Sequence, residues 1–343
     1  MLQCHHKNEH APSYSITYLS NHTLNNQQEI ETLVNDIEEA LDYHALTSEV
    51  NLFNHHYDSE PFYYQTPYLY PILTKSKEVY HKTQGAFDPT IAPYINLWQR
   101  HKKVGSEPSE EDIWAISPVV SLDYIVVNET RVKKLKEAVT INVNNLITSF
   151  QADAIAHWLQ QKHVKDFCIQ LKDAVVAQGM PSKKKQWRII KSIAHPDLEA
   201  PLHVHIDLGD SAMAIIDNST ALENDTAQAE ICIDPVTGDI VPQHCIVALV
   251  FAKDCVTARS YATAFMTKHF SNVLALSTPT EEDYLEFVMI EKDEETNGIK
   301  YKHSAGLKII HKEGSTKVLI QRSEDPPSKT NVDEEKEGVE DAS

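Results

Sequence analysis

Arg259 and Thr263 stand four residues apart in the segment VTARSYATAFM, which runs from Val256 to Met266. Residues at this spacing share one face of a helix, so the pattern presents a guanidinium beside a hydroxyl. A guanidinium has a permanent positive charge and only hydrogen-bond donors, which suits an anion and opposes a metal ion. Most neighbouring positions hold small residues, namely Ala258, Ser260, Ala262 and Ala264. The segment predicts an amphipathic helix that other elements approach closely.

Two histidines form a second pattern with possible chemistry. His203 and His205 alternate in LHVHIDL and therefore share one face of a strand. The other face is apolar and consists of Leu202, Val204, Ile206 and Leu208. A metal site needs further ligands, and no third one is identifiable; the five cysteines are scattered without a CxxC pair. We therefore expect these histidines to face solvent.

Composition limits the classes of partner. The chain has 343 residues and a net charge of −19, which argues against nucleic acid and anionic lipid as partners of the whole molecule. It has 9 glycines where average usage of about 7% would give roughly 24, so loops that close around a phosphate should be few. The longest apolar run, CIVALVFA, falls far short of the roughly 20 residues of a spanning helix, so no transmembrane segment is expected.

Helical and strand patterns are mixed along the chain, which predicts an α+β fold. Helical spacing covers 27–44, 71–83 and 150–163, and Ser109 is placed to cap a further helix. Strand patterns cover 14–19, 123–128, 167–171, 187–193, 202–208, 229–234, 244–252, 285–292, 305–311 and 317–321. These elements predict one domain over 14–322, after a polar segment at 1–13. Residues 323–343 carry eight acids against two lysines and are expected to form a disordered acidic tail.

Three segments carry a family resemblance. GAFDPTIAPYINLW (85–98) and IDPVTG (233–238) resemble signatures of the FAD:protein FMN transferase family, the ApbE family, and TSEVNLFN (47–54) is similar to a third segment. With WRI at 187–189 and ATA at 262–264, the likeness covers about residues 14–312. It implies a T-fold-like arrangement of mixed sheets with flanking helices around a flavin-type cleft.

The resemblance also implies a reaction and its partners. Members of the family split the pyrophosphate of FAD and pass FMN to a threonine of a target flavoprotein, with Mg²⁺ bridging the phosphates. FAD and a target flavoprotein are thus the expected partners. Members are mostly exported, periplasmic or lipid-anchored, whereas the sequence as written shows no signal peptide, so the location stays open.

Some residues match positions that the family uses. The resemblance assigns cofactor binding to Asn54, Asp88, Thr90, Asp234 and Thr237, and metal binding to Thr263. Asp88 and Asp234 also have a structural explanation, because Asp-Pro sequences favour tight turns.

Other family positions are changed. The segment INVNNLITSF (141–150) has asparagines where the family has an acid and two glycines, and it has Ile147 and Thr148 in place of an alanine and a lysine; Asp153 survives downstream. Lys172-Asp173-Ala174 replaces a Gly-Gly-acid step. Ile231 stands at the position of a histidine with a proton-transfer role, and isoleucine cannot move a proton. Arg259 stands at the position of an aspartate that binds magnesium, an ion that prefers oxygen ligands.

Three interpretations remain open. The chain is an active FMN transferase with rearranged ligands, or a member that binds flavin or a partner without turnover, or a pseudoenzyme that has lost its ligand and serves as an interaction domain. In the second, Arg259 would pair with a pyrophosphate in place of the metal ion. In the third, bulky residues such as Ile147, Thr148 and Lys172 would fill the flavin volume.

Overall fold

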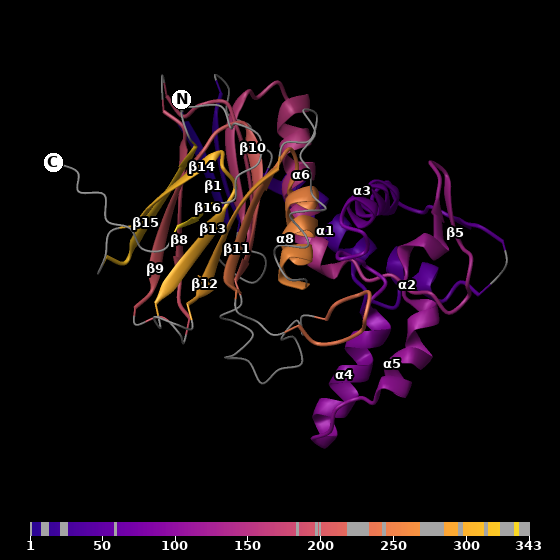
Figure 1. The fold of residues 1–343 in the computed structure, drawn as a ribbon. Coiled ribbons are helices and arrows are strands. Elements are labelled where there is room, and N and C mark those ends of the chain that lie inside the picture. Colours follow the sequence, from indigo (N-terminus) through magenta and orange to yellow (C-terminus); the bar gives the residue numbers. More distant parts are fainter. Residues whose placement is uncertain are drawn as a thin grey trace.

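A β-sandwich, a layer of helices and a smaller helical lobe lie in that order across the molecule (Figure 1). This computed structural model describes residues 2–7, 14–20, 27–57, 60–182, 185–195, 198, 200–217, 233–241, 245–267, 285–293, 298–311, 315–322 and 333–335. The mixture of sheets and helices confirms the predicted α+β class.

The helices are α1 (Gln27–Leu41), α2 (Glu49–Asn54), α3 (Leu69–Lys82), α4 (Ala92–Val104), α5 (Glu110–Ile116), α6 (Asn144–Gln161) and α8 (Cys255–Thr267). The strands are β1 (Leu2–Lys7), β2 (Tyr14–Leu19), β3 (Phe62–Tyr63), β4 (Ile125–Val127), β5 (Arg131–Lys134), β6 (Asp166–Leu171), β7 (Ala174–Gln178), β8 (Trp187–Ile193), β9 (Leu202–Leu208), β10 (Ser211–Asp217), β11 (Cys245–Ala252), β12 (Leu285–Lys292), β13 (Ile299–His303), β14 (Leu307–His311), β15 (Lys317–Arg322) and β16 (Asp333–Glu335).

A nine-stranded sheet is the larger of the two sheets of the sandwich. Its order is β1-β2-β6-β7-β10-β11-β12-β13-β16, and each adjacent pair is antiparallel. The interior strand β11 is the apolar run CIVALVFA, and all eight of its residues are buried. A strand covered on both faces needs apolar side chains at successive positions, which explains why this run does not alternate.

The second sheet covers one face of the first, in the order β14-β15-β9-β8. The apolar residues of β9 point inward, from Leu202 at 4% exposure to Val204 at 0%. His203 is exposed and His205 half-buried on the other face, as predicted. No group of three metal-ligating side chains occurs within the described residues, and the two histidines belong to none.

Helix α8 lies against the other face of the large sheet, between β10 and β11 and helices α3 and α6 (Figure 1). The predicted amphipathic pattern is wrong, because eleven of the helix's thirteen residues are buried. Its alanines and serine are small enough for close packing on both sides, so the helix needs no solvent face. Thr257 and Thr263 are the two half-buried positions.

Beyond this layer, α2 to α5 and the small sheet β3-β5-β4 form the lobe. Ser109 begins α5 with a capping box, in which its hydroxyl accepts from the Asp112 amide and the Asp112 carboxylate accepts from the Ser109 amide. Within the part of the chain that the structure describes, no helix is long and apolar enough to cross a membrane.

Both ends of the chain reach the large sheet. Strand β1 pairs with β2 at one edge and β16 pairs with β13 at the other. The remaining tail residues lie outside the described ones, so the predicted disorder there and the domain boundaries at 13 and 322 stay predictions.

Candidate functional site

Two of the segments that carry the family resemblance, GAFDP and DPVTG, meet near the C-terminal end of α8. The Thr267 hydroxyl donates to the Ala86 carbonyl at 2.7 Å, which ties the helix to the GAFDP segment. The side chain of Val236, in the DPVTG turn, lies 3.6 Å from the point where a Cβ on Gly85 would be. The fold thus brings GAFDP, DPVTG and the end of α8 together although they are far apart in the sequence.

Asn54, at the end of α2, uses both polar atoms of its side chain on the backbone. Its Nδ2 donates to the Ile141 carbonyl and its Oδ1 accepts from the Ile141 amide, both at 2.8 Å. The side chain is 4% exposed. Lys134 Nζ donates to the Asn54 carbonyl at 2.7 Å. This residue therefore joins α2 to the chain just before Asn142.

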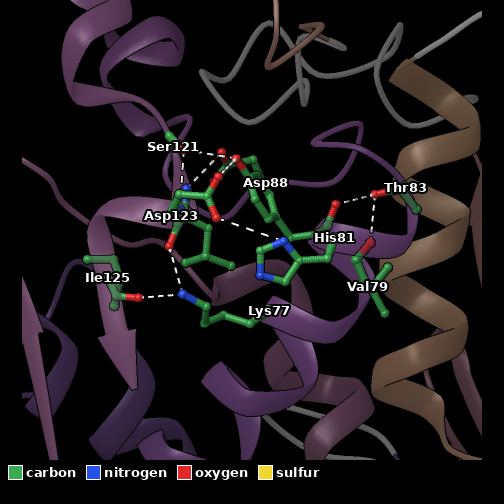
Figure 2. Close-up of polar contacts among 10 residues, drawn as sticks. Lys77, Val79, His81, Thr83, Asp88, Ser121, Asp123 and Ile125 are labelled. Carbon is green, nitrogen blue, oxygen red and sulfur yellow. Dashed lines mark hydrogen bonds and ion pairs between the residues drawn. The ribbon is translucent and has the colours of Figure 1, made fainter. Parts of the chain in front are cut away.

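Asp88 and Thr90 form a closed turn. Asp88 Oδ1 accepts from the amide and the hydroxyl of Thr90, each at 2.7 Å, and Oδ2 accepts from the Leu122 amide at 3.2 Å. Burial raises the pKa of Asp88 to about 6, although these hydrogen bonds oppose the shift. Close to Leu122, Lys77 Nζ donates to the Ile125 carbonyl at 2.6 Å (Figure 2). Asp88 and Thr90 therefore use their side chains for hydrogen bonds within the protein.

Asp234 and Thr237 lie in a tight turn next to α4. Asp234 Oδ1 accepts from the Val236 amide at 2.9 Å, and the Gly238 amide donates to the Asp234 carbonyl at 2.7 Å. Trp98 Nε1 donates to the Gly238 carbonyl at 2.8 Å. Thr237 is exposed, and its hydroxyl accepts from the Asp239 amide at 3.3 Å. Of the carried-over side chains, that of Thr237 is the most open to a ligand.

Replacing Gly238 by alanine should lower the free energy of unfolding by about 2 kcal/mol. Gly238 has φ of +79°, and an added Cβ would come within 2.6 Å of Ile113 and 2.8 Å of Tyr94. Urea denaturation would measure the change, with Gly105→Ala as control. Gly105 has φ of +70° but no atom within 4 Å of the added Cβ. Equal losses in the two variants would contradict the packing contribution.

Arg259 projects from α8 toward the turn between β6 and β7. Its Nη1 donates to Asp173 Oδ2 at 2.8 Å and to the Ile215 carbonyl at 3.0 Å. The Arg259 side chain is 9% exposed and that of Asp173 is 26% exposed. Thr263 donates its hydroxyl to the Arg259 carbonyl, one helical turn back, at 3.0 Å. The charge of the arginine is therefore matched by a carboxylate of the same chain.

The β6–β7 turn that supplies Asp173 departs from ordinary backbone geometry. Lys172 has φ of +34°, near the region that glycine adopts most easily. Its carbonyl accepts from Lys191 Nζ at 2.6 Å, and the Asp173 carbonyl accepts from the Ile215 amide at 2.8 Å. These bonds hold the turn against β8 and β10 and so fix the carboxylate that faces Arg259.

These residues do not fit a magnesium ion. The ion needs several oxygen ligands in near-octahedral geometry, whereas Arg259 offers donors and a positive charge, and the Thr263 hydroxyl supplies a single oxygen at most. Ile147, which stands in place of the family's alanine, has a buried side chain in the apolar core. Ile231 lies outside the residues that the structure describes.

Asp153 connects two helices of this region in a way that the sequence pattern did not indicate. From α6, its Oδ1 accepts from the Cys255 amide at 2.8 Å and its Oδ2 accepts from the Val256 amide at 3.0 Å. These are the first two amides of α8, which have no partner within their own helix. A carboxylate 102 residues away in sequence thus caps the helix that carries Arg259.

Known proteins resemble this chain over most of its length. The model of the ApbE family matches residues 12–288. A FAD:protein FMN transferase of Vibrio cholerae is 23% identical over 273 residues, which are 78% of this chain and 80% of the relative. One of Haemophilus influenzae is 23% identical over 304 residues, 86% of this chain and 85% of the relative.

Solved structures agree with the fold. The flavin transferase ApbE from Vibrio cholerae matches with a TM-score of 0.72 at 22% identity, covering 89% of this chain and 97% of the other. The apo form of the Pseudomonas stutzeri flavinyl transferase ApbE also has a TM-score of 0.72, at 18% identity, covering 88% and 94%. With the family match across most of its residues, this chain belongs to the ApbE family.

Proposed function

We propose that this chain is a non-catalytic member of the family of FAD:protein FMN transferases, and that it acts by binding a protein partner. The observation that carries the proposal is the buried Arg259, paired with Asp173 at 2.8 Å on the helix where the resemblance places a magnesium ligand.

The charges of the Arg259–Asp173 pair explain why it opposes FMN transfer. Cleavage of a pyrophosphate depends on cations that neutralise the charge developing on the phosphate oxygens. Arg259 is held by Asp173 and by the Ile215 carbonyl, so its charge is already compensated. A substrate phosphate would have to compete with a carboxylate fixed at hydrogen-bond distance. The pair therefore supports neither magnesium binding nor the use of Arg259 as a substitute cation.

Three of the five carried-over flavin positions support the same proposal. The side chains of Asn54, Asp88 and Thr90 are buried, and each is hydrogen-bonded within the chain. To bind FAD through them, the protein would have to break these bonds or add further ones. This favours an interaction domain over a flavin-binding domain.

The test is an assay for FMN transfer. The full chain would be incubated with FAD, Mg²⁺ and a flavoprotein domain that carries an acceptor threonine, and AMP release and covalent flavin would be followed. We expect neither product above background, while the Vibrio cholerae relative serves as the positive control. AMP release at a rate within tenfold of that control would contradict the proposal and favour an active enzyme with rearranged metal ligands.

FAD binding without turnover is measured separately. Quenching of flavin fluorescence with and without Mg²⁺ would detect it at micromolar protein. We expect no quenching in either condition. Quenching without Mg²⁺ that Arg259→Ala abolishes would instead support the interpretation in which the arginine pairs with the pyrophosphate.

A further inference from the structure

Helices α4 and α5 form a hairpin that projects from the lobe, away from the sandwich (Figure 1). Residues 105–109 connect the two helices, and Gly105 ends α4 in the left-handed conformation with φ of +70°. The inner faces of the hairpin pack through the buried side chains of Leu97 and Ile113. With a rise of about 1.5 Å per residue, α4 is roughly 20 Å long. The tip of the hairpin is therefore open to another molecule.

The tip of the hairpin carries two patches of opposite charge. The basic patch consists of Arg100, Lys102 and Lys103, which are exposed near the end of α4. The acidic patch consists of Glu110 and Glu111, which are exposed in the first turn of α5. Among the residues that the structure describes, none of these five side chains makes an ion pair. Both patches can therefore pair with charges of another molecule.

Trp114 adds an apolar group to the acidic patch. The residue is 67% exposed, and Glu110 and Glu111 share its face of α5 because they precede it by four and three residues. On α4, Val104 is 78% exposed and Arg100 precedes it by four residues. Charged residues at helix ends are common on solvated surfaces, but an exposed indole ring forgoes the free energy that its burial would release. The tryptophan therefore points to a surface that another molecule covers.

We propose that the α4–α5 hairpin is the contact surface of a homodimer, in which α4 of each protomer lies against α5 of its partner. Twofold symmetry repeats each contact, so both basic patches meet acidic patches. Arg100 can then stack on the partner subunit's Trp114, a favourable contact between a guanidinium and an indole ring. A second copy fits this surface better than a uniformly acidic or basic partner, which one of the two patches would repel.

The net charge of −19 favours a contact through this hairpin over contacts elsewhere on the surface. Two copies of so acidic a chain repel each other, and the repulsion between exposed charges decays over about 8 Å at physiological ionic strength. Contact through hairpins that project from the lobe keeps much of the acidic surface of the two copies beyond that distance. Because the hairpin is small, the dimer should be weak and should depend on protein concentration.

This dimer goes beyond the proposed function and is tested independently of it. Changes in the two patches leave Trp98, whose Nε1 donates to the Gly238 carbonyl, as it is. The assay for FMN transfer decides whether the chain is an enzyme, whereas the mass of the particle in solution decides whether it forms this dimer.

The experiment measures dimerisation of the full chain by sedimentation velocity, from micromolar to submillimolar protein. One variant combines Lys102→Glu with Lys103→Glu, and a second variant combines Glu110→Lys with Glu111→Lys. We expect the wild type to dimerise and each variant alone to dimerise about tenfold more weakly, because like charges then face each other. An equimolar mixture of the two variants should form a heterodimer about as readily as the wild type dimerises, since opposite charges meet again at both contacts.

The matched control combines Arg131→Glu with Lys133→Glu on β5, where both side chains are exposed and the net charge changes by the same amount. It should dimerise like the wild type. Trp114→Ala should weaken the dimer about tenfold, as the loss of a central aromatic contact does. A wild type that stays monomeric at submillimolar concentration would overturn the proposal. So would equal dimerisation of all variants, which would place the contact elsewhere, or a mixture that dimerises no better than its two components.

Discussion

Replacing Arg259 by methionine should lower the free energy of unfolding by about 3 kcal/mol. Methionine retains much of the side-chain volume and removes the charge and the donors. Asp173 then loses the cation at 2.8 Å, and the Ile215 carbonyl loses a donor at 3.0 Å. Because the Asp173 side chain is 26% exposed, water recovers part of the loss, which places the effect at the lower end for buried pairs. Urea denaturation at 25 °C would measure it.

A double-mutant cycle separates the pair from the rest of the site. Asp173→Asn removes the charge of the acid at nearly constant shape, and the Arg259→Met, Asp173→Asn double variant removes both charges. We expect a coupling free energy of about 2 kcal/mol between the two positions. Arg188 and Asp207 provide the surface control, since they are paired at 2.6 Å with Arg188 55% exposed and should couple by less than about 1 kcal/mol. Coupling at the buried pair no larger than at the surface pair would refute a structural role for Arg259.

The same pair determines the response to magnesium. If Arg259 and Asp173 already balance each other inside the fold, Mg²⁺ has no site there that would stabilise the folded state by linkage. The melting temperature should therefore be equal in excess Mg²⁺ and in chelator.

Local patterns predicted the elements that bury one face. The alternation in 202–208 defined β9 and the outward histidines, and Ser109 followed by Asp112 defined the start of α5. In both, the information lies within a few neighbouring residues, where side-chain period and capping chemistry act directly. The family segments predicted the fold class for a different reason, since their turns need particular residues wherever they occur.

Local sequence patterns could not predict which elements surround α8. A run of small residues with one arginine looks amphipathic, because the sequence does not show that helices and sheet cover it on all sides. The partner of Arg259 is Asp173, 86 residues earlier in a hairpin turn, and no local period links the two. The start of α6 at Asn144, before the predicted Phe150, has a local cause: the Asn142 side chain accepts from the Asn144 amide at 3.0 Å.

Replacing Asp153 by alanine should also lower the free energy of unfolding by about 3 kcal/mol. Its two carboxylate oxygens accept from the amides of Cys255 and Val256, so the change leaves two donors at the start of α8 without their acceptors. Urea denaturation would measure the effect, with Asp254→Ala as control. Asp254 accepts from the Thr257 amide at 2.7 Å, but its side chain is 28% exposed. Asp254→Ala should therefore lower the free energy of unfolding by about 1 kcal/mol.

The pH dependence of this carboxylate gives a sharper test. Burial, and then the charge of Asp254, raise the pKa of Asp153 to about 8 from an ordinary value of 3.8. The folded state therefore keeps a proton that the unfolded chain releases above pH 4, and this contribution to stability is lost as the pH rises toward 8. Asp153→Asn cannot titrate and lacks this loss. The loss in free energy of unfolding that Asp153→Asn causes, relative to the wild type, should therefore be smaller at pH 8.5 than at pH 5.5. A cost that stays constant over this range would show instead that the amides of α8 hold Asp153 ionised, with the helix dipole outweighing burial.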